Sequence, residues 1–138
     1  MTIRQGASPM VTGENNGALT GLKVIEMGQL IAGPFCGQLL GDMGADVVKI
    51  EPPGAGDPMR NWGNGEHKVW WEVIGRNKRS VTANLRVPEG QELARRLLAD
   101  ADIMIENFKP GTMEKWGLAP DRLHALNPRL IIVRMSGY

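Results

Sequence analysis

This 138-residue chain has a single cysteine, no large excess of either charge and no long apolar run. The single cysteine, Cys36, excludes an internal disulfide framework and favours a reducing compartment. The 16 Lys and Arg residues nearly balance the 15 Asp and Glu residues, and a net charge of +1 argues against non-specific nucleic-acid binding. No segment has the roughly 20 apolar residues of a membrane span, and no secretory signal is present. The composition therefore predicts a cytoplasmic protein with neither nucleic acid nor a membrane as partner.

The chain also lacks the signatures of several common cofactors. The first predicted strand-to-helix turn is GQLIAGPFCG, which is not the GxGxxG of dinucleotide-binding proteins, and no P-loop is present. One cysteine and two histidines, His67 and His124, give no metal-ligand spacing. Cys36 lies on an apolar stripe, where a buried, unreactive thiol is favoured over a nucleophile. We therefore expect no metal and no NAD.

What the chain does contain is a complete strand, helix and strand between Gly21 and Asp57. Apolar, β-branched segments at Leu22–Met27 and Asp46–Ile50 suit parallel strands buried on both faces. Between them, Pro34 suits a first helical turn, and Gly44 suits a helix end. We expect an apolar stripe of this helix to pack on the sheet; it consists of Cys36, Leu39, Leu40 and Met43. A second strip carries the glycines Gly37 and Gly41, which permit close packing against a neighbouring element.

The remaining segments continue the alternation of strands and helices. We expect an α/β fold with a Rossmann-like open parallel sheet and helices on both faces, incomplete at its C-terminal end, over residues 21–138, preceded by a disordered leader at residues 1–20. The sequence of Val69–Ile74 is compatible with either a helix or a strand. The other expected elements are a loop at Pro52–Lys68, a strand at Arg79–Arg86, a helix at Pro88–Ala101, a strand at Ile103–Glu106, a turn at Asn107–Gly111, short helices at Thr112–Trp116 and Pro120–Leu126, and a strand at Leu130–Met135.

Three loops follow predicted strands, at Gly28–Gly33, Pro52–Asp57 and Asn107–Gly111. In open parallel sheets, ligands bind beyond the carboxyl ends of the strands. No acid–base pair or triad can be assembled, but the backbone-rich loops and scattered cations suit a phosphate-bearing ligand. The position of Asp57, before a proline in a glycine-rich loop, indicates a turn-forming role rather than a catalytic one. The tryptophans favour packing over stacking on a base; they are Trp62, Trp70, Trp71 and Trp116.

Four blocks in the same order resemble the family III coenzyme A transferases, which include formyl-CoA and carnitine CoA transferases and the related α-methylacyl-CoA racemases. They are GLKVIEMGQLIAGPFCGQLLGDMGADVVKIEPPGAGDPMR, NKRSVTANLR, ADIMIENFKPGTMEKWGL and NPRLIIVRMSGY. The resemblance covers nearly all of Gly21 to Tyr138, as the N-terminal portion of such a protein. It implies a Rossmann-like domain, acyl-CoA and a small carboxylic acid as substrates, and a homodimer of interlocked subunits.

The resemblance also implies coenzyme A contacts and a mechanism. The contacts carried over are Ile31, Ala32, Ala83, Asn84, Leu85, Arg86, Asn107, Phe108, Lys109 and Lys115. Formyl-CoA transferase-like sequences carry a glutamine where this chain has Ile31, and Gln29 is a possible substitute. An aspartate attacks the thioester in such transferases, and the resemblance places it beyond Tyr138, so no catalytic residue is assigned here. A racemase-like isomerase, a non-catalytic CoA-binding module and a nucleotide-binding protein unrelated to CoA are the alternatives.

Overall fold

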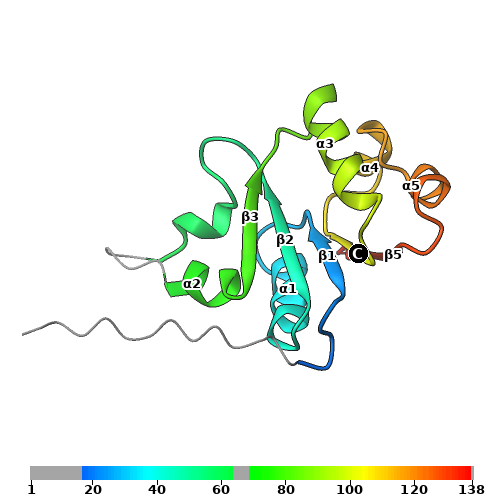
Figure 1. Ribbon diagram of the computed structural model, residues 1–138. Helices are drawn as coiled ribbons and strands as arrows, with labels where there is room; N and C mark the ends of the chain where they lie inside the picture. The colour runs from blue at the N-terminus through cyan, green and yellow to red at the C-terminus, as the bar shows by residue number, and fades with distance from the viewer. Residues whose placement is uncertain (1–16, 64–68, 138) are drawn as a thin grey trace, which may run out of the picture.

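The computed structural model describes residues 17–63 and 69–137 as a single parallel sheet with helices packed on it (Figure 1). Its five strands run in the order β3-β2-β1-β4-β5, and each neighbouring pair is parallel. This is the strand order of Rossmann-type domains. The strands are β1 (Lys23–Glu26), β2 (Asp46–Glu51), β3 (Lys78–Thr82), β4 (Ile103–Glu106) and β5 (Ile131–Arg134). The α/β prediction is confirmed.

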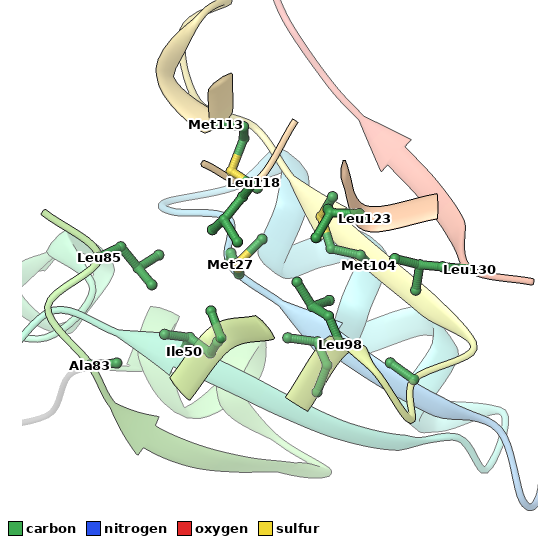
Figure 2. Packing of buried hydrophobic residues seen from close by; sticks show 13 residues of the cluster. Met27, Ile50, Ala83, Leu85, Leu98, Met104, Met113, Leu118, Leu123 and Leu130 are labelled. Atoms are coloured by element: carbon green, nitrogen blue, oxygen red, sulfur yellow. The ribbon is translucent and has the colours of Figure 1, made fainter. Parts of the chain in front are cut away.

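The helices cover both faces of the sheet, as predicted. Val24 and Ile25 are neighbours in β1 but belong to two different apolar clusters, because successive strand residues point to opposite faces. One cluster gathers beneath α3, α4 and α5 (Figure 2), and the other beneath α1. The helices are α1 (Ala32–Asp42), η1 (Pro58–Asn61, a 3-10 turn), α2 (Val69–Gly75), α3 (Pro88–Leu98), α4 (Thr112–Lys115) and α5 (Pro120–Leu126).

The predicted sheet-facing stripe of α1 is confirmed for two of its four residues. Cys36 and Leu40 are partly buried and pack against the apolar cluster on this face of the sheet, whereas Leu39 and Met43 are 42% and 51% exposed. The most deeply buried side of the helix is its glycine strip, where a Cβ added to Gly37 would lie 2.2 Å from Glu26 Oε2. The glycines let α1 lie so close to the sheet that Leu39 and Met43 are turned outward. The close packing inferred from these glycines is confirmed.

Most other boundaries lie within two residues of the predicted ones. Val69–Ile74 is helical, as part of α2. The strand predicted at Arg79–Arg86 ends at Thr82, because the chain turns at Ala83–Val87 before α3 begins. The predicted leader lies largely outside the described residues, and its last four, 17–20, form a turn in which Leu19 N donates to Met43 O at 2.9 Å. Within the described ranges no helix is long and apolar enough to cross a membrane.

Candidate functional site

A cavity of about 540 Å³ opens at the carboxyl ends of β1 to β4, where the topology predicts a ligand. Three loops form its walls: the segment after β2, the segment after β3, and the segment from β4 to α4. It is lined by Met27, Gln29, Ile50, Glu51, Pro52, Pro53, Ala55, Ala83, Asn84, Leu85, Arg86, Phe108, Lys109, Thr112 and Trp116.

Six of the ten contacts carried over from the family resemblance line this cavity. They are Ala83, Asn84, Leu85, Arg86, Phe108 and Lys109. The other four lie beside it: Ile31 and Ala32 are exposed where α1 begins, Lys115 is exposed at the last residue of α4, and the side chain of Asn107 bonds to the backbone of Gln29. Whether any of the ten touches a ligand stays a prediction.

The wall after β3 brings a cation to the start of a helix. The Asn84 side chain accepts a hydrogen bond from Arg86 N at 3.1 Å, which shapes the turn. A Cβ added to Gly90 would lie 2.0 Å from Asn84 O, so only glycine lets α3 begin this close to the turn. Arg86 is exposed at the cavity. A guanidinium beside uncapped helical N–H groups attracts an anion such as a phosphate.

The wall after β4 is aromatic and carries the second cation. Phe108 and Trp116 meet edge to face, with ring centroids 5.0 Å apart and planes at 76°. Gly111 holds the turn between them with φ at 85°, and Lys109 is exposed on it. The cavity therefore combines an aromatic wall with two cations, Arg86 and Lys109, which suits a ligand that carries a nucleotide.

The wall after β2 is anchored by Glu51, whose side chain is 3% exposed. Burial alone would raise the pKa of Glu51, but two hydrogen bonds from Arg60, each of 2.7 Å, one from Ser80 Oγ and one from Asp57 N lower that pKa to about 2. Arg60 also lies over the ring of Trp71, 3.8 Å from its centroid. Glu51 is thus a paired structural anion.

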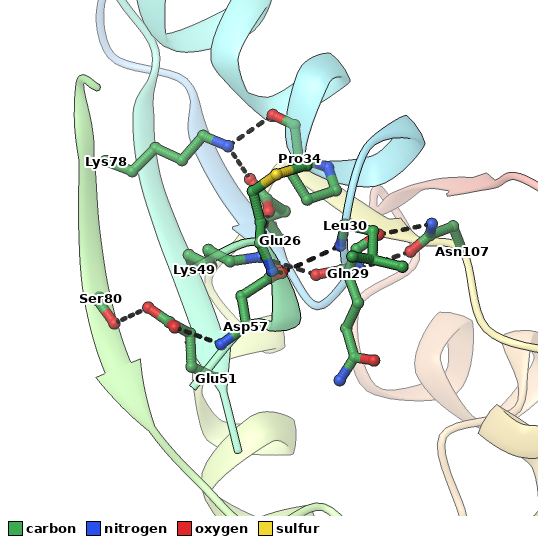
Figure 3. A network of polar contacts seen from close by, with 12 residues as sticks. Glu26, Gln29, Leu30, Pro34, Lys49, Glu51, Asp57, Lys78, Ser80 and Asn107 are labelled. Carbon is green, nitrogen blue, oxygen red and sulfur yellow. Dashed lines mark hydrogen bonds and ion pairs between the residues drawn. The ribbon is translucent and has the colours of Figure 1, made fainter. Parts of the chain in front are cut away.

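Beneath the loop after β1 lies a buried charge cluster of Glu26, Lys49, Lys78 and Asp57 (Figure 3). Lys49 Nζ lies 2.7 Å from Glu26 Oε1 and 2.8 Å from Asp57 Oδ2, and Lys78 Nζ lies 2.6 Å from Glu26 Oε2. Burial lowers the pKa of Lys78, against the opposing effect of Glu26. Two cations balance two carboxylates, so the cluster is neutral as a whole.

Asp57 has the turn-forming role that the sequence favours. Its Oδ1 accepts a hydrogen bond from Met59 N at 2.8 Å, capping η1, and its side chain is 1% exposed. It does not line the cavity. Among the tryptophans, packing is confirmed for Trp71 and Trp116, whereas Trp62 and Trp70 lie on the surface, 43% and 59% exposed.

The Cys36 thiol is half-buried in the packing beneath α1, and burial, with the nearby Glu26 charge, raises its pKa. A raised pKa leaves little thiolate, as expected of an unreactive cysteine. In the part of the chain that the structure describes, no group of His, Cys, Asp and Glu could hold a metal ion.

Pro52, Pro53, Ala55, Thr112 and Trp116 also line the cavity, although the sequence did not single them out as ligand contacts, and so does Gln29, which the sequence offered only as a substitute for the family glutamine. Their only sequence signal is position, since each lies just after a strand or on the turn that follows one. A cavity of this size at the carboxyl edge of a Rossmann-ordered sheet, with two cations and an aromatic wall, is suited to a nucleotide-type ligand.

Comparison with known proteins gives the family. Residues 19–138 match CoA-transferase family III, and the chain belongs to this family. It is 56% identical over 123 residues to the succinyl-CoA–D-citramalate CoA-transferase of Chloroflexus aurantiacus, covering 87% of this chain and 31% of that protein. It is 44% identical over 129 residues to the succinate–glutarate CoA-transferase of Agrobacterium fabrum, covering 87% of this chain and 32% of that protein.

The fold matches solved structures of similar sequence. A CAIB/BAIF family protein from Brucella suis superimposes with a TM-score of 0.82 at 45% identity, over 89% of this chain and 34% of that chain. The hypothetical protein Rv3272 from Mycobacterium tuberculosis gives a TM-score of 0.83 at 40% identity, over 88% and 34%. The chain thus spans about a third of the length of the relatives it matches.

Proposed function

We propose that this chain is the acyl-CoA-binding part of a CoA-transferase that moves coenzyme A from an acyl-CoA thioester to a small carboxylic acid. The observation that carries the proposal is the cavity at the carboxyl edge, because six of the residues that family resemblance assigns to coenzyme A line it together. They come from segments about 25 residues apart in sequence that the fold brings to one place.

The cavity chemistry matches the ligand. Coenzyme A carries phosphates at one end and a long apolar arm with amides that leads to its thiol. Arg86 and Lys109 are placed for the phosphates, and the Phe108–Trp116 wall offers an apolar surface beside them. Ile31 and Ala32, just outside the cavity where α1 begins, would meet the ligand where it leaves.

The reaction needs a nucleophile, which the cavity does not supply. Glu51 is the one carboxylate among the described residues that line it, and its oxygens are engaged by Arg60, Ser80 and Asp57 N. We propose that an aspartate from a segment beyond Tyr138 attacks the thioester. Its carboxylate would displace the CoA thiolate and form a mixed anhydride, and the thiolate would then attack the aspartyl carbonyl, release the donor acid and form an aspartyl-CoA thioester. The acceptor carboxylate would displace the thiolate from this thioester to form a second mixed anhydride, and attack of the thiolate on the acceptor carbonyl would release the new acyl-CoA and regenerate the aspartate without hydrolysis.

The relatives narrow the substrate class. Their names specify succinate, free or as succinyl-CoA, together with citramalate and glutarate, and all three acids are small dicarboxylic acids. We propose a dicarboxylic acyl-CoA as donor and a dicarboxylic acid as acceptor for the whole protein.

Calorimetry with coenzyme A tests the binding proposal. We expect saturable one-to-one binding, and at least about 10-fold weaker binding for Arg86→Met combined with Lys109→Met, since a hydrogen bond to a charged group contributes about 1.5–3 kcal/mol. Arg96→Met, which removes an exposed cation of α3 outside the cavity, is the matched control and is expected to bind normally.

Three outcomes would contradict this proposal. If Arg96→Met weakened coenzyme A binding as much as the double variant, the loss would reflect the overall charge of the protein and not the cavity. Competition by ADP without any gain from the pantetheine arm would favour a nucleotide-binding protein. Turnover of succinyl-CoA and an acceptor acid by the 138-residue chain itself would show that the nucleophile lies within it.

We also propose that the chain pairs with a second copy of itself through the outer faces of α1 and α2. These helices pack side by side (Figure 1), and each exposes an apolar row, with exposed fractions of 41–59%. Exposed apolar rows on neighbouring helices are typical of protein interfaces. The rows are Ile31, Phe35, Leu39 and Met43 on α1, and Val69, Trp70 and Val73 on α2.

Sedimentation velocity over a concentration series tests this pairing. We expect dimers that dissociate on dilution, and a shift to monomer in Phe35→Glu and Trp70→Glu, because each would bury an unpaired carboxylate at the interface. Leu126→Glu, an exposed apolar position on α5, is the control. A wild-type chain that stays monomeric at every concentration would contradict the proposal.

A further inference from the structure

The loop after β1 is held by an amide clamp. Gln29 N donates to Asn107 Oδ1 at 2.7 Å, and Asn107 Nδ2 donates back to Gln29 O at 2.9 Å (Figure 3). Both polar atoms of the Asn107 side chain are therefore used on one backbone residue. The pairing joins the ends of β1 and β4, which lie side by side in the sheet.

The same loop is fixed from its other side by the buried charge cluster. Lys49 Nζ donates to Gly28 O at 2.8 Å, and Leu30 N donates to Asp57 Oδ1 at 3.1 Å. Leu30 has φ at 63°, a left-handed conformation that a leucine adopts only when its surroundings impose it. Three successive residues, 28–30, are thus held by side chains on both sides, and the direction of the Gln29 side chain is set in advance.

The Gln29 side chain is the part that the clamp leaves available. It extends away from Asn107 (Figure 3), it is half-buried, and it lines the cavity. Its amide makes no hydrogen bond to any residue within 17–63 or 69–137, although both polar atoms of its backbone are paired. An amide on a fixed backbone, with free donor and acceptor groups, is suited to a ligand that offers both.

We propose that Gln29 is a specificity-determining residue that hydrogen-bonds an amide of the pantetheine arm, and that Asn107 is the positioning residue that aims it. This inference rests on the proposed function and assigns one portion of the ligand to one side chain. The cavity cations Arg86 and Lys109 suit phosphate, whereas a neutral amide is complementary to another amide. The nucleotide end and the amide arm are then recognised by separate groups.

The test compares two ligands, coenzyme A and 3′-phosphoadenosine 5′-diphosphate, which has the phosphates without the arm. We expect Gln29→Leu, which keeps the size of the side chain, to weaken coenzyme A binding about 5-fold, the effect of one neutral hydrogen bond. Binding of the arm-less nucleotide is expected to stay within twofold of wild type. An equal loss for both ligands, or no loss for either, overturns the assignment.

A second set of variants tests the positioning role of Asn107. Asn107→Ala is expected to produce the same selective loss in the wild-type background and none in the Gln29→Leu background, because the clamp acts only through Gln29. A merely structural role would weaken both ligands and add to the Gln29 effect. Additive losses in the double variant would therefore refute the clamp.

Asn127→Ala is the matched control for fold stability. Asn127 is also a buried amide that bonds backbone carbonyls, with Nδ2 2.7 Å from Ala101 O and 3.0 Å from Leu98 O, but at the amino ends of β4 and β5. It should destabilise the chain without changing the ratio of the two affinities. If the wild-type chain binds neither ligand, the proposed function fails. If it binds both ligands but Gln29→Leu does not weaken coenzyme A binding selectively, only the role of Gln29 fails.

Discussion

Replacing Lys49 with methionine is expected to lower the free energy of unfolding by about 3–5 kcal/mol, the range for removing one partner of a buried ion pair. The ammonium group contacts Glu26, Asp57 and Gly28 O, and the side chains of the two carboxylates are 0% and 1% exposed. Methionine fills similar space but cannot compensate either charge. Glu26 keeps Lys78, so the uncompensated charge is chiefly that of Asp57. Urea unfolding followed by circular dichroism measures the loss.

Two further variants show whether burial is the reason. Arg79→Met breaks an ion pair with Asp46 in which the side chains are 70% and 50% exposed, so we expect a change of about 0–1 kcal/mol. Asp57→Asn added to Lys49→Met should recover part of the stability, because it removes the unpaired charge while an amide oxygen can still accept from Leu30 N and Met59 N. A Lys49→Met chain as stable as Arg79→Met would disprove a structural role for the cluster.

The second large effect is expected from Gly37→Ala, which should lower the free energy of unfolding by up to about 2 kcal/mol. The new methyl group would lie 2.2 Å from Glu26 Oε2, and that oxygen is held in place by Lys78. Overpacking of this kind costs about 1–3 kcal/mol or more, and alanine regains only about 1 kcal/mol through its better helix propensity. Thermal unfolding measures the difference.

Gly137→Ala is the control for this substitution, because a Cβ there meets no heavy atom within 4 Å. Gly137→Ala should leave the midpoint temperature of thermal unfolding unchanged. Gly41→Ala tests the same helix strip more gently, since its Cβ would lie 3.2 Å from Asn77 O. A stabilised Gly37→Ala chain would mean that α1 is free to move off the sheet, contrary to the packing described above.

Local sequence signals predicted the order and type of the elements well, because alternating strands and helices leave clear periodicity. β4 and α5 have the predicted boundaries, with Pro120 beginning α5 and Asn127 ending it. The buried face of α1 was predicted only in part, since periodicity favours all its apolar residues as the buried ones, whereas Leu39 and Met43 are exposed. Here a buried ion pair between Glu26 and Lys78 requires glycines on that face. Charges far apart in sequence gave no local sign of their pairing.

The candidate site shows the same division. That ligands bind at the strand ends follows from the topology, which singled out the loop containing Phe108 and Lys109, whereas Arg86 was assigned from the family resemblance. Gln29 was named only as a substitute for the family glutamine, and the hydrogen bonds between its backbone and the side chain of Asn107, 78 residues away, could not be predicted. Sequence spacing carries no information on which of two amides is occupied and which is free.

All five strands of the described chain are parallel, which has a consequence for how the domain forms. A parallel pair cannot close through a tight hairpin, so each pair waits for a crossover to be completed. The central strand β1 pairs with β2 across about 20 residues but with β4 only when Val24 meets Ile103, much later in the chain. Such distant pairings carry a large loop-closure entropy and slow the folding rate. During synthesis, one edge of β1 therefore stays open until β4 has emerged.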